Sequence, residues 1–403
     1  MLCRICKSAS LHKFLSLGPI PLVNSLLKTE QLNLPENYFP LDVYFCAGCT
    51  LVQLTYVVPP ETLFRDYVYL TGTSKTMRQH FGELARDIEQ RFGVEGSLVI
   101  DIGGNDGTLL HGFRKPRVLN VEPARNIAQI SEANGVKSYP EFFSEKTAGD
   151  ILEKFGKARV IIGTNVFAHC NDIDDFVKGV LVLLEDEGVF VVEFPYLADM
   201  ISQNEFDTIY HEHLSYFSVS PLVRHFGRYG LEIFDVQRFA VHGGSIRLFV
   251  KRKGAPHRST GALEKILKLE NDMKLDAFDT YLAFASRVRA IREKLLAMLR
   301  KAKSEGKRVA GYGAPAKGNI LLNYCGIGTG LLEYTVDKNE MKQGFFTPGM
   351  HIPIYGPGKL MEDKPDYVLL LAWNFGGEIM KQEQGYHLSG GRFIVPIPEP
   401  SVV

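Results

Sequence analysis

The sequence predicts an α/β protein assembled from several parts in tandem, and three features lead to this expectation. Four of its six cysteines lie within the first fifty residues, as two Cys-x-x-Cys pairs. From about residue 73 onward, short apolar runs alternate with helical segments, a pattern that favours a doubly wound parallel sheet. After a long helical stretch, roughly the last hundred residues restart the same alternation.

A chain of 403 residues is too long for one ordinary domain, so we expect four segments. They are a small cysteine-containing module at 1–65, a central α/β domain at 66–252, a helical connector at 253–305 and a second α/β domain at 306–403. Hydrophobic residues make up 45% of the chain and charged residues 23%, which is enough apolar material for ordinary cores.

The charge balance excludes some classes of partner. Lys plus Arg equals Asp plus Glu, at 46 each, so we expect no general attraction to nucleic acid or to a membrane surface. The N-terminus has no apolar stretch of signal-peptide length, and no apolar run approaches the roughly 18 residues that span a bilayer. A cytoplasmic location with reduced cysteines is the resulting expectation.

The elements expected in the two α/β domains follow from local patterns. Apolar residues at helical spacing predict a helix over about 73–92, and the proline-free segment 261–307 has a helical period and a glycine stop at Gly306. Segment 231–252 predicts an antiparallel hairpin. The remaining strands are expected within 97–103, 117–123, 158–167 and 188–197, and then within 308–314, 332–337, 352–357, 366–373 and 391–398.

The two cysteine pairs, Cys3 with Cys6 and Cys46 with Cys49, predict a zinc site. Each pair spaces two thiolates suitably for two corners of a zinc tetrahedron. Disulfides are the alternative, but a reducing location disfavours them, and no strand leads into either pair as a thioredoxin-type motif requires. Four thiolates complete the coordination shell, so the zinc would be structural rather than catalytic.

The segment DIGGNDG follows an apolar strand and leads into a helix, so it is a ligand-binding loop candidate. Its spacing differs from the G-x-G-x-x-G of pyrophosphate binders, and its two aspartates would repel a pyrophosphate. Negative charge suits a cationic ligand such as a sulfonium or an amino group. The candidate cofactor residues of this loop are Asp101, Gly103, Gly104, Asn105, Asp106 and Gly107.

Glu122 adds to this pattern because it ends the next expected strand. A carboxylate at that position can accept hydrogen bonds from both hydroxyls of a ribose. Together, the loop and Glu122 favour S-adenosylmethionine (SAM) over NAD, while a tight structural turn with a coincidental glutamate is the alternative. The segment GTNVFAH, with Asn165 and His169, would end a further strand at the same ligand-binding edge.

The chain resembles the zinc-containing class I SAM-dependent C-methyltransferases that act on nucleotide-linked keto-deoxysugars. The resemblance spans nearly the whole chain and rests on motifs that occur together and in order. They are CRIC with CAGC, PLDVYFCAGCTLVQL, DIGGNDG, IYHEHLSYFS, VHGGSIR, and GYGAPAKGN followed by NYCGIG. Related loops often read E-x-G-C-N-D-G. Asp101 keeps the carboxylate of that pattern, and Gly104 keeps the position of the cysteine small.

This resemblance implies a zinc module and a C-terminal Rossmann-like domain that flank a SAM-dependent methyltransferase domain at 66–252. Substrate would lie in the cleft between the parts. The family includes enzymes that methylate carbon 3 of a 4-keto sugar joined to thymidine diphosphate. We therefore expect a nucleotide-linked sugar as partner and a monomer or small homo-oligomer.

Methylation at carbon requires a carbon nucleophile, which removal of the proton next to a ketone provides as an enolate. The enzyme then needs a general base at the carbon and a hydrogen-bond donor at the ketone oxygen. The resemblance implies His213 as the base, with Tyr210 and Glu212 at neighbouring active-site positions and His169 facing the same cleft. We expect Tyr210 or His169 to donate to the ketone, and Glu212 to orient a histidine or bind a sugar hydroxyl.

The same motif permits a metal interpretation, which the sequence disfavours. If the segment is a strand, His211 and His213 share one face and could chelate an ion. However, the H-E-x-x-H pattern is absent and no third ligand is signalled nearby. We expect His211 to bond to the backbone in the core instead.

Five further residues are candidates for closing the site or for binding the substrate. The resemblance implies that a tyrosine from RDYVYLTGTS closes the active site, so Tyr67 and Tyr69 are candidates, with packing at a domain junction as the alternative. GYGAPAKGN lacks the Gly-Lys-Ser/Thr of a Walker loop, yet Lys317 at a helix start, with Gly313 before it, could meet a diphosphate.

Arg247, in VHGGSIR, is the last candidate. Its guanidinium could pair a phosphate bidentately, or it could lie on a solvated face beside a bulge.

Three other functions compete with carbon methylation. The methyl group could go to oxygen or nitrogen of another nucleotide-sugar-like acceptor. Two Rossmann-like halves could form an NAD-dependent oxidoreductase, although neither glycine loop has the pyrophosphate pattern. A non-catalytic zinc protein that retains SAM binding is also conceivable, but the density of His, Glu and Tyr at 210–216 disfavours it.

Overall fold

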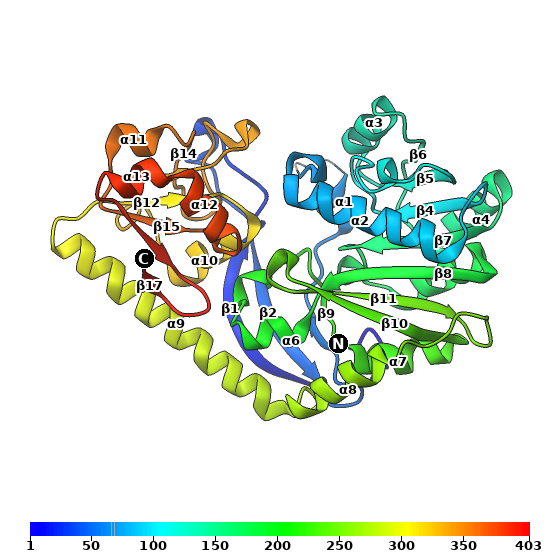
Figure 1. The fold of residues 1–403 in the computed structure, drawn as a ribbon. Helices are drawn as coiled ribbons and strands as arrows, with labels where there is room; N and C mark the ends of the chain where they lie inside the picture. Colours follow the sequence, from blue (N-terminus) through cyan, green and yellow to red (C-terminus); the bar gives the residue numbers. More distant parts are fainter. Residues whose placement is uncertain (66, 68) are drawn as a thin grey trace.

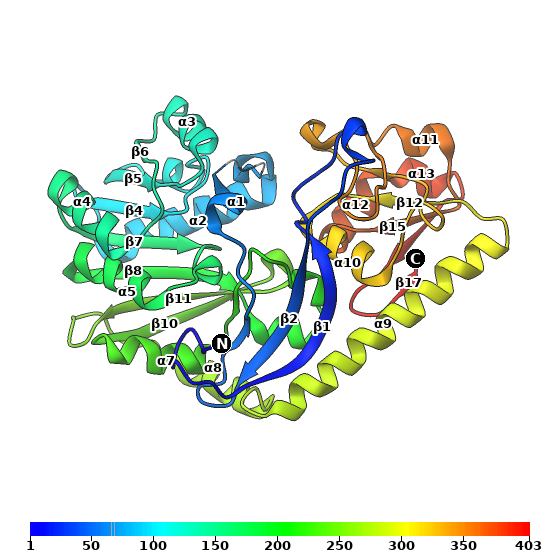
Figure 2. The ribbon, with the colours of Figure 1, turned by 180° about the vertical axis from the view of Figure 1, so that it is seen from behind.

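The structure, a computed structural model, describes residues 1–65, 67 and 69–403, apart from the side chain of His242. It consists of two α/β lobes that an N-terminal hairpin and one long helix hold side by side (Figure 1). The reverse view shows the hairpin running between the lobes and the long helix passing beneath the C-terminal lobe (Figure 2). The predicted α/β class, with its doubly wound sheet, is confirmed.

The N-terminal strands form a four-stranded antiparallel sheet in the order β1-β2-β3-β9. Its strands are β1 (Leu11–Pro21), β2 (Tyr38–Cys46), β3 (Val52–Leu54) and β9 (Ser215–Tyr216). The last strand comes from the segment that carries the histidine motif. The cysteine module therefore shares a sheet with the candidate active site.

The segment between the two cysteine pairs does not fold as a separate small unit. It forms the long β1–β2 hairpin, whose tip reaches the C-terminal lobe, where Leu27 and Phe346 form a β-bridge. The Glu36 carboxylate accepts hydrogen bonds there from the His351 ring, at 2.6 Å, and from the backbone of Gly349. The hairpin thus connects both lobes.

The central lobe is built on a seven-stranded sheet in the order β10-β11-β8-β7-β4-β5-β6. Its strands are β4 (Leu98–Ile102), β5 (Arg117–Val121), β6 (Ser138–Tyr139), β7 (Ala158–Thr164), β8 (Leu184–Pro195), β10 (Leu231–Phe239) and β11 (Ser245–Arg252). Strands β4 to β8 are parallel, and β10 and β11 form the predicted antiparallel hairpin.

Helices cover both faces of this sheet. The predicted first helix is α2, which packs on one face through the apolar residues that the sequence pattern identified, while α4, α5 and α7 pack on the other. The Ser74 hydroxyl caps α2 by accepting from the Met77 backbone N–H. The helices are α1 (Pro60–Phe64), α2 (Lys75–Phe92), α3 (Arg125–Ala133), α4 (Glu145–Phe155), α5 (Ile173–Leu183), α6 (Leu197–Ser202) and α7 (Val219–Arg228).

The connector contains two helices rather than the single helical segment that the sequence suggested. Helix α8 (Ala262–Asp272) ends before a short break, and α9 (Phe278–Ser304) then crosses the molecule (Figure 1). Buried Glu270 fixes α8, because its carboxylate accepts hydrogen bonds from the Val219 and Ser220 backbone and from the Tyr196 hydroxyl. Gly306, with φ +73°, follows the end of α9 as predicted.

The C-terminal lobe has a six-stranded sheet in the order β14-β13-β12-β15-β16-β17, parallel except for β17. Its strands are β12 (Val309–Tyr312), β13 (Thr335–Val336), β14 (Ile354–Tyr355), β15 (Tyr367–Leu370), β16 (Arg392–Val395) and β17 (Ser401–Val402). Its helices are α10 (Ala316–Cys325), α11 (Lys359–Asp363), α12 (Gly376–Gln382) and α13 (Gln384–Leu388). The predicted second α/β alternation is confirmed.

Within the part of the chain that the structure describes, none of the helices combines the length and the apolar character needed to cross a bilayer.

Candidate active site

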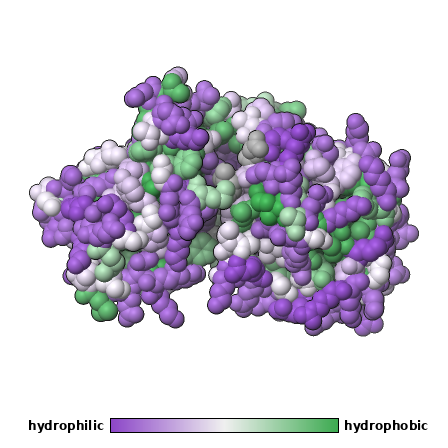
Figure 3. All heavy atoms as spheres, turned by 90° about the horizontal axis from the view of Figure 1, so that it is seen from above, coloured by the Kyte–Doolittle hydropathy of each residue, from purple (hydrophilic) through white to green (hydrophobic). Residues whose placement is uncertain are grey.

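A cavity of about 940 Å³ lies where the carboxyl ends of the parallel strands of the two lobes face each other. Its wall includes the loops after β4, β5 and β7, the turn that carries His213, and the start of α10. Seen from above, hydrophobic side chains gather near the line where the lobes meet, while hydrophilic ones dominate the outer rim (Figure 3). Ligands bind at this edge of open α/β sheets.

The acidic loop presents an uncompensated carboxylate to the cavity. Asp101 ends β4 and is buried, and neither of its carboxylate oxygens has a hydrogen-bond partner among the described residues. Burial, and then the nearby charge of Glu122, raise the pKa of Asp101 well above its usual range. A cationic ligand would supply the missing favourable interaction, so the residues present fit SAM.

Glu122 both lines the cavity and shapes it. One carboxylate oxygen accepts from the backbone N–H of Asn105 at 2.9 Å, and the other from that of Ala124, also at 2.9 Å. Burial raises the pKa of Glu122 to about 6. Asn165 also lines the cavity, and its buried side-chain oxygen has no hydrogen-bond partner among the described residues.

Gly104 is required by the close packing beneath the loop. A Cβ atom at this position would lie 2.6 Å from the Asn120 side-chain oxygen and 2.7 Å from an Asp101 oxygen. Both neighbours are buried, so neither can move aside easily. In this chain the loop therefore has no room even for a methyl group at residue 104.

Not every residue of the acidic loop reaches the cavity. Gly103, Gly104 and Asn105 line it, whereas Asp106 and Gly107 lie outside its wall. The Asp106 carboxylate instead accepts from the backbone N–H of Gly72 at 2.7 Å. Asp106 therefore holds the segment before α2 in place and does not line the cavity.

The turn before β9 brings an aromatic and imidazole cluster to the cavity wall. His213 is only 8% exposed, and its Nδ1–H donates to the Thr208 carbonyl at 2.9 Å. Its ring lies 4.0 Å from the Tyr210 ring and 5.1 Å from the His169 ring, centroid to centroid. All four residues line the cavity. The structure thus brings together the three side chains that the sequence placed at the reacting centre.

The protonation states of this cluster follow from burial. Burial lowers the pKa of His169 to about 4, so this imidazole is neutral at pH 7, and its Nε2 has no hydrogen-bond partner among the described residues. Burial, and then the Glu212 charge, raise the pKa of the Tyr210 phenol well above its usual range. Both side chains can therefore act as neutral donors.

The histidine motif does not form a strand through His211 and His213, which is the condition that the metal interpretation required. The chain forms a 3-10 helix at Phe206–Thr208 and then a turn, because the His213 backbone N–H bonds to the Tyr210 carbonyl at 2.9 Å. The His211 ring points elsewhere, toward the Phe39 carbonyl at 3.3 Å, as expected for a backbone-bonded histidine. The two histidines do not share a face, so the motif cannot chelate one ion.

Glu212 lies behind the cavity wall rather than in it. Its two carboxylate oxygens accept from the Asn24 amide at 2.6 Å and from the Tyr67 hydroxyl at 2.9 Å, and both donors line the cavity. Burial raises the pKa of Glu212 to about 7. Asn24 comes from the β1–β2 hairpin, and no sequence motif pointed to it.

The two candidate tyrosines, Tyr67 and Tyr69, both line the cavity. The Tyr67 backbone exchanges hydrogen bonds with the Asn126 side chain on α3, which holds the segment against the central lobe. Tyr69 is 43% exposed at the cavity mouth, and its carbonyl accepts from the Asn105 amide. That one of them closes the active site stays a prediction.

The C-terminal lobe contributes a group of lysines. Lys317 lines the cavity beside Gly313, pairs with Glu205 at 3.1 Å and lies over the Trp373 ring at 5.3 Å. Lys338 and Lys342, which the sequence reasoning missed, line the same wall. The signal that could have revealed them is the segment TVDKNEMK, which follows an expected strand.

Arg247 does not belong to this wall. Its guanidinium lies within the central lobe, 2.7 Å from the Glu193 carboxylate and 3.2 Å from the His80 ring, and its side chain is buried. Glu193 is entirely buried, and its carboxylate forms an ion pair with the Arg247 guanidinium that was a candidate for binding phosphate. The structure therefore gives Arg247 a structural place and no access to the cavity.

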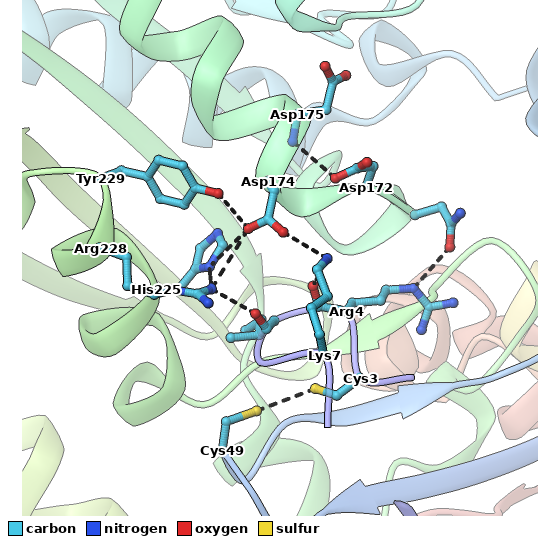
Figure 4. Close-up of polar contacts among 12 residues, drawn as sticks. Cys3, Arg4, Lys7, Cys49, Asp172, Asp174, Asp175, His225, Arg228 and Tyr229 are labelled. Carbon is cyan, nitrogen blue, oxygen red and sulfur yellow. Dashed lines mark hydrogen bonds and ion pairs between the residues drawn. The ribbon is translucent and has the colours of Figure 1, made fainter. Parts of the chain in front are cut away.

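The four N-terminal cysteines lie together beside the central lobe, and Figure 4 shows two of them, Cys3 and Cys49. All four sulfur atoms fall within 4.8 Å of one another, with Cys3 to Cys49 at 3.4 Å and Cys6 to Cys46 at 3.5 Å. None forms a disulfide. Tetrahedral zinc with bonds of about 2.3 Å requires sulfur separations of roughly 3.8 Å, so the cluster fits a zinc ion.

Comparison with known proteins agrees with this arrangement. A zinc binding domain profile matches residues 3–64, a methyltransferase domain profile matches 77–236, and a C-methyltransferase C-terminal domain profile matches 240–398. The C-methyltransferase NovU from Streptomyces niveus is 40% identical over 404 residues, which cover 100% of this chain and 96% of the relative. The chain belongs to the C-methyltransferase family. It is a SAM-dependent C-methyltransferase with a four-cysteine zinc module, as the sequence predicted.

Solved structures resemble the protein only weakly. A magnesium protoporphyrin IX methyltransferase from Synechocystis PCC 6803 is 13% identical, with a TM-score of 0.35, and the match covers 44% of this chain and 83% of the other. A SAM-dependent methyltransferase from Clostridium acetobutylicum is 11% identical, also with a TM-score of 0.35, and covers 44% of this chain and 92% of the other. Likenesses at this level support no argument.

Proposed function

We propose that the enzyme methylates the carbon next to the ketone of a nucleotide-linked keto-deoxysugar, through an enolate. The observation that carries this proposal is the position of His213 on the wall of a cavity that both lobes form. To the same cavity wall the central lobe contributes the acids Asp101 and Glu122, and the C-terminal lobe contributes a group of three lysines. A sugar between a cationic cofactor and an anionic diphosphate would match both sides.

His213 is proposed as the general base. Its Nδ1–H donates to the Thr208 carbonyl, which keeps the proton on Nδ1 and makes Nε2 the basic nitrogen. The Nε2 atom would remove the proton from the sugar carbon, leaving the electron pair as an enolate. An imidazole whose ordinary pKa is about 6.5 suits proton transfer near neutral pH.

His169 and Tyr210 are the proposed donors to the ketone oxygen. Both rings lie within about one ring width of His213, and both remain neutral because they are buried. A neutral N–H or O–H aimed at the oxygen stabilises the negative charge that develops there. Glu212 would act indirectly, by orienting Asn24 and Tyr67 toward the sugar hydroxyls.

The cofactor site is proposed on the opposite wall. SAM supplies an electrophilic methyl group on a sulfonium. Glu122 would accept from the ribose hydroxyls, and Asp101 would face the positive charge, while Tyr69 would cover the mouth. The other cavity-lining contacts would come from Gly103, Gly104, Asn105 and Asn165.

The substrate diphosphate is proposed to lie against the C-terminal lobe. Lys317 sits in the first turn of α10, where free backbone N–H groups and the helix dipole add to its charge. Lys338 and Lys342 lie on the same wall, and Gly313 lets the backbone approach closely. A thymidine diphosphate sugar is the class of substrate that the motifs imply.

Solvent exchange tests the base directly. The protein is incubated in deuterated water with a 4-keto nucleotide sugar, without SAM, and deuterium at the carbon next to the ketone is followed by NMR. We expect exchange in the wild type and a decrease of about 10²–10⁴-fold in His213→Asn. His211→Asn, two residues away and turned from the cavity, is the matched control and should exchange normally.

Two outcomes would contradict the proposal. Wild-type exchange in His213→Asn would remove this histidine from the base role. Absence of exchange in the wild type, across several keto sugars that bind the protein, would exclude the enolate route and favour another methyl acceptor.

A further inference from the structure

Arg4 occupies an unusual position inside the first cysteine knuckle. It lies between Cys3 and Cys6, yet its side chain turns inward and is only 7% exposed. Figure 4 shows Arg4 beside the Cys3–Cys49 pair, with Lys7 and Asp174 on the other side of the same knuckle. A buried guanidinium must satisfy five N–H donors, so its partners define its role.

Two partners of the Arg4 guanidinium lie in the loops that carry His169 and His213, and the other two lie on β3. One terminal nitrogen donates to the Leu214 carbonyl at 3.1 Å and also to the Leu54 carbonyl, and Nε donates to the Asn171 side-chain oxygen at 3.3 Å. Leu214 directly follows His213 in the chain. Asn171 follows His169 by two residues and itself lines the cavity.

These two loops also contact each other beneath the histidine rings. The Leu214 backbone N–H donates to the Ala168 carbonyl at 2.8 Å, and the rings of His169 and His213 stack at 5.1 Å. The separation of the two rings therefore depends on how the two backbones lie against each other. The planar guanidinium of Arg4 is rigid and bonds to both loops, so it would fix the separation of the two rings.

The charge of Arg4 has no carboxylate partner among the described residues. Its acceptors are neutral carbonyl and amide oxygens, which include the Gln53 side chain at 3.2 Å. A zinc ion bound by four thiolates carries a net charge of 2−, and Cys3 directly precedes Arg4. The zinc cluster would therefore supply the countercharge that a buried guanidinium requires.

We propose that Arg4 is a positioning residue, which couples the zinc knuckle to the reaction by holding the His169 and His213 loops in register. The zinc module would then set the geometry of the reacting groups in addition to stabilising the fold. The role is indirect, because Arg4 lies outside the cavity wall.

Lys7 provides a matched control within the same knuckle. Its ammonium pairs with Asp174 on α5 at 2.7 Å and donates to the Arg4 backbone carbonyl at 2.8 Å. The Lys7→Met variant therefore removes a positive charge and a docking contact from the knuckle, but it removes none of the hydrogen bonds from the Arg4 guanidinium to the histidine loops. It therefore separates the general effect of knuckle docking from the specific effect of Arg4.

The test compares Arg4→Met, Arg4→Lys and Lys7→Met with the wild type. Zinc content is measured by metal analysis, and the ring signals of His169 and His213 are followed by histidine NMR, with assignment from the His169→Asn and His213→Asn variants. We expect about one zinc per chain in each of the three test variants. Both ring signals should shift in Arg4→Met, less in Arg4→Lys, and not in Lys7→Met.

The kinetic expectation is a split between parameters. A displacement of about 1 Å lowers a rate roughly 10²-fold, so kcat should fall by about 10–100-fold in Arg4→Met while the KM for SAM changes by less than twofold. Arg4→Lys keeps the charge but lacks the planar fork, and should recover only part of the rate.

Unchanged ring signals and kcat in Arg4→Met would overturn the proposal, as would equal shifts in Lys7→Met. If Arg4→Met fails to fold, Arg4→Lys decides by the same criterion, since it keeps the buried charge. The ring signals report the positions of the histidines whether or not His213 is the base, so a failure of the proposed function can be recognised separately.

Discussion

The two glycine loops of the molecule share a backbone design and differ in charge. In the central lobe, Glu122 follows β5 and accepts from the backbone N–H of Asn105, in the loop after the neighbouring strand β4. In the C-terminal lobe, Asp337 follows β13 and accepts from the N–H of Ala314 at 2.7 Å, in the loop after the neighbouring strand β12. A carboxylate thus fixes the loop of its neighbour in both lobes.

The difference lies in what surrounds each carboxylate. Near Glu122, the cavity wall includes Asp101, another acid, whose pKa the charge of Glu122 helps to raise. Around Asp337, Lys342 lies at 3.8 Å, and Lys317 lines the same wall. The same loop architecture can therefore serve opposite ligand charges, and the side chains beside the loop decide which charge is accepted.

The largest effect that would test this contrast is expected from Glu122→Ala. Loss of the carboxylate that we propose as acceptor for the ribose hydroxyls should weaken SAM binding about 100-fold, since bonds to charged groups contribute roughly 1.5–3 kcal/mol each. Affinity for thymidine diphosphate should stay within twofold. Calorimetric titration of both ligands measures the difference, with exposed Glu132→Ala on α3 as control. An equal loss of affinity for both ligands would contradict the proposal that each loop binds a different ligand.

The reciprocal change, Lys317→Met, should affect the other ligand. We expect thymidine diphosphate to bind about 10–30-fold more weakly, because one charge-assisted contact to phosphate is lost, while SAM affinity stays unchanged. Titration at low and high salt should also show a weaker salt dependence in the variant. Lys381→Met, at an exposed position on α12, is the control. Unaltered diphosphate binding would remove Lys317 from the substrate site.

A smaller effect is expected from Gly104→Ala. The added methyl group would press on Asn120 and Asp101 at 2.6–2.7 Å, so the loop must shift outward and narrow the SAM pocket. We expect SAM binding to weaken about 5–10-fold, with a lower Tm, because overpacking a buried site costs about 1–3 kcal/mol. Gly82→Ala on α2, where a methyl group meets only the end of Arg86, should leave SAM affinity unchanged and should not lower the Tm, since alanine favours a helix interior more than glycine does. A normal SAM affinity in Gly104→Ala would show that the loop can accommodate the methyl group without narrowing the SAM pocket.

The smallest effect concerns the pH dependence of stability through Glu212. Its pKa is about 7 in the folded protein, against an ordinary value of 4.5. Between these pH values the folded state binds more protons than the unfolded state, so the free energy of unfolding decreases as the pH rises. Wild type should lose roughly 2–4 °C of Tm relative to Glu212→Gln from pH 5 to pH 8. Parallel Tm curves for the two proteins would contradict this pKa.

Several parts of the site could be predicted because the signal is local. The four zinc ligands follow from two short spacings. The proximity of Asp101 and Glu122 follows from neighbouring parallel strands that end at the same sheet edge. The choice between His211 and His213 could not be made from periodicity, because the motif forms a turn rather than a strand. Only the turn decides which imidazole faces the cavity.

Contacts between distant segments could not be predicted in the same way. The pairing of Arg247 with Glu193 joins two strands of the sheet interior and removes Arg247 from the substrate candidates. Asn24 reaches Glu212 across 188 residues of chain, from a hairpin that showed no functional motif. Arg4 reads in the sequence as an ordinary residue between two zinc ligands.

The sequence by itself determined the α/β class and the cysteine zinc ligands, and it indicated the acidic loop and the chemical kind of the proposed reacting groups. Each of these depends on residues close together in the chain, whose spacing sets strand ends, turns and chelation. The tertiary structure decided which of those groups reach the cavity and which hold others in place. That choice depends on the docking of the two lobes and the hairpin, whose contacts join residues far apart in the sequence and are fixed only by packing.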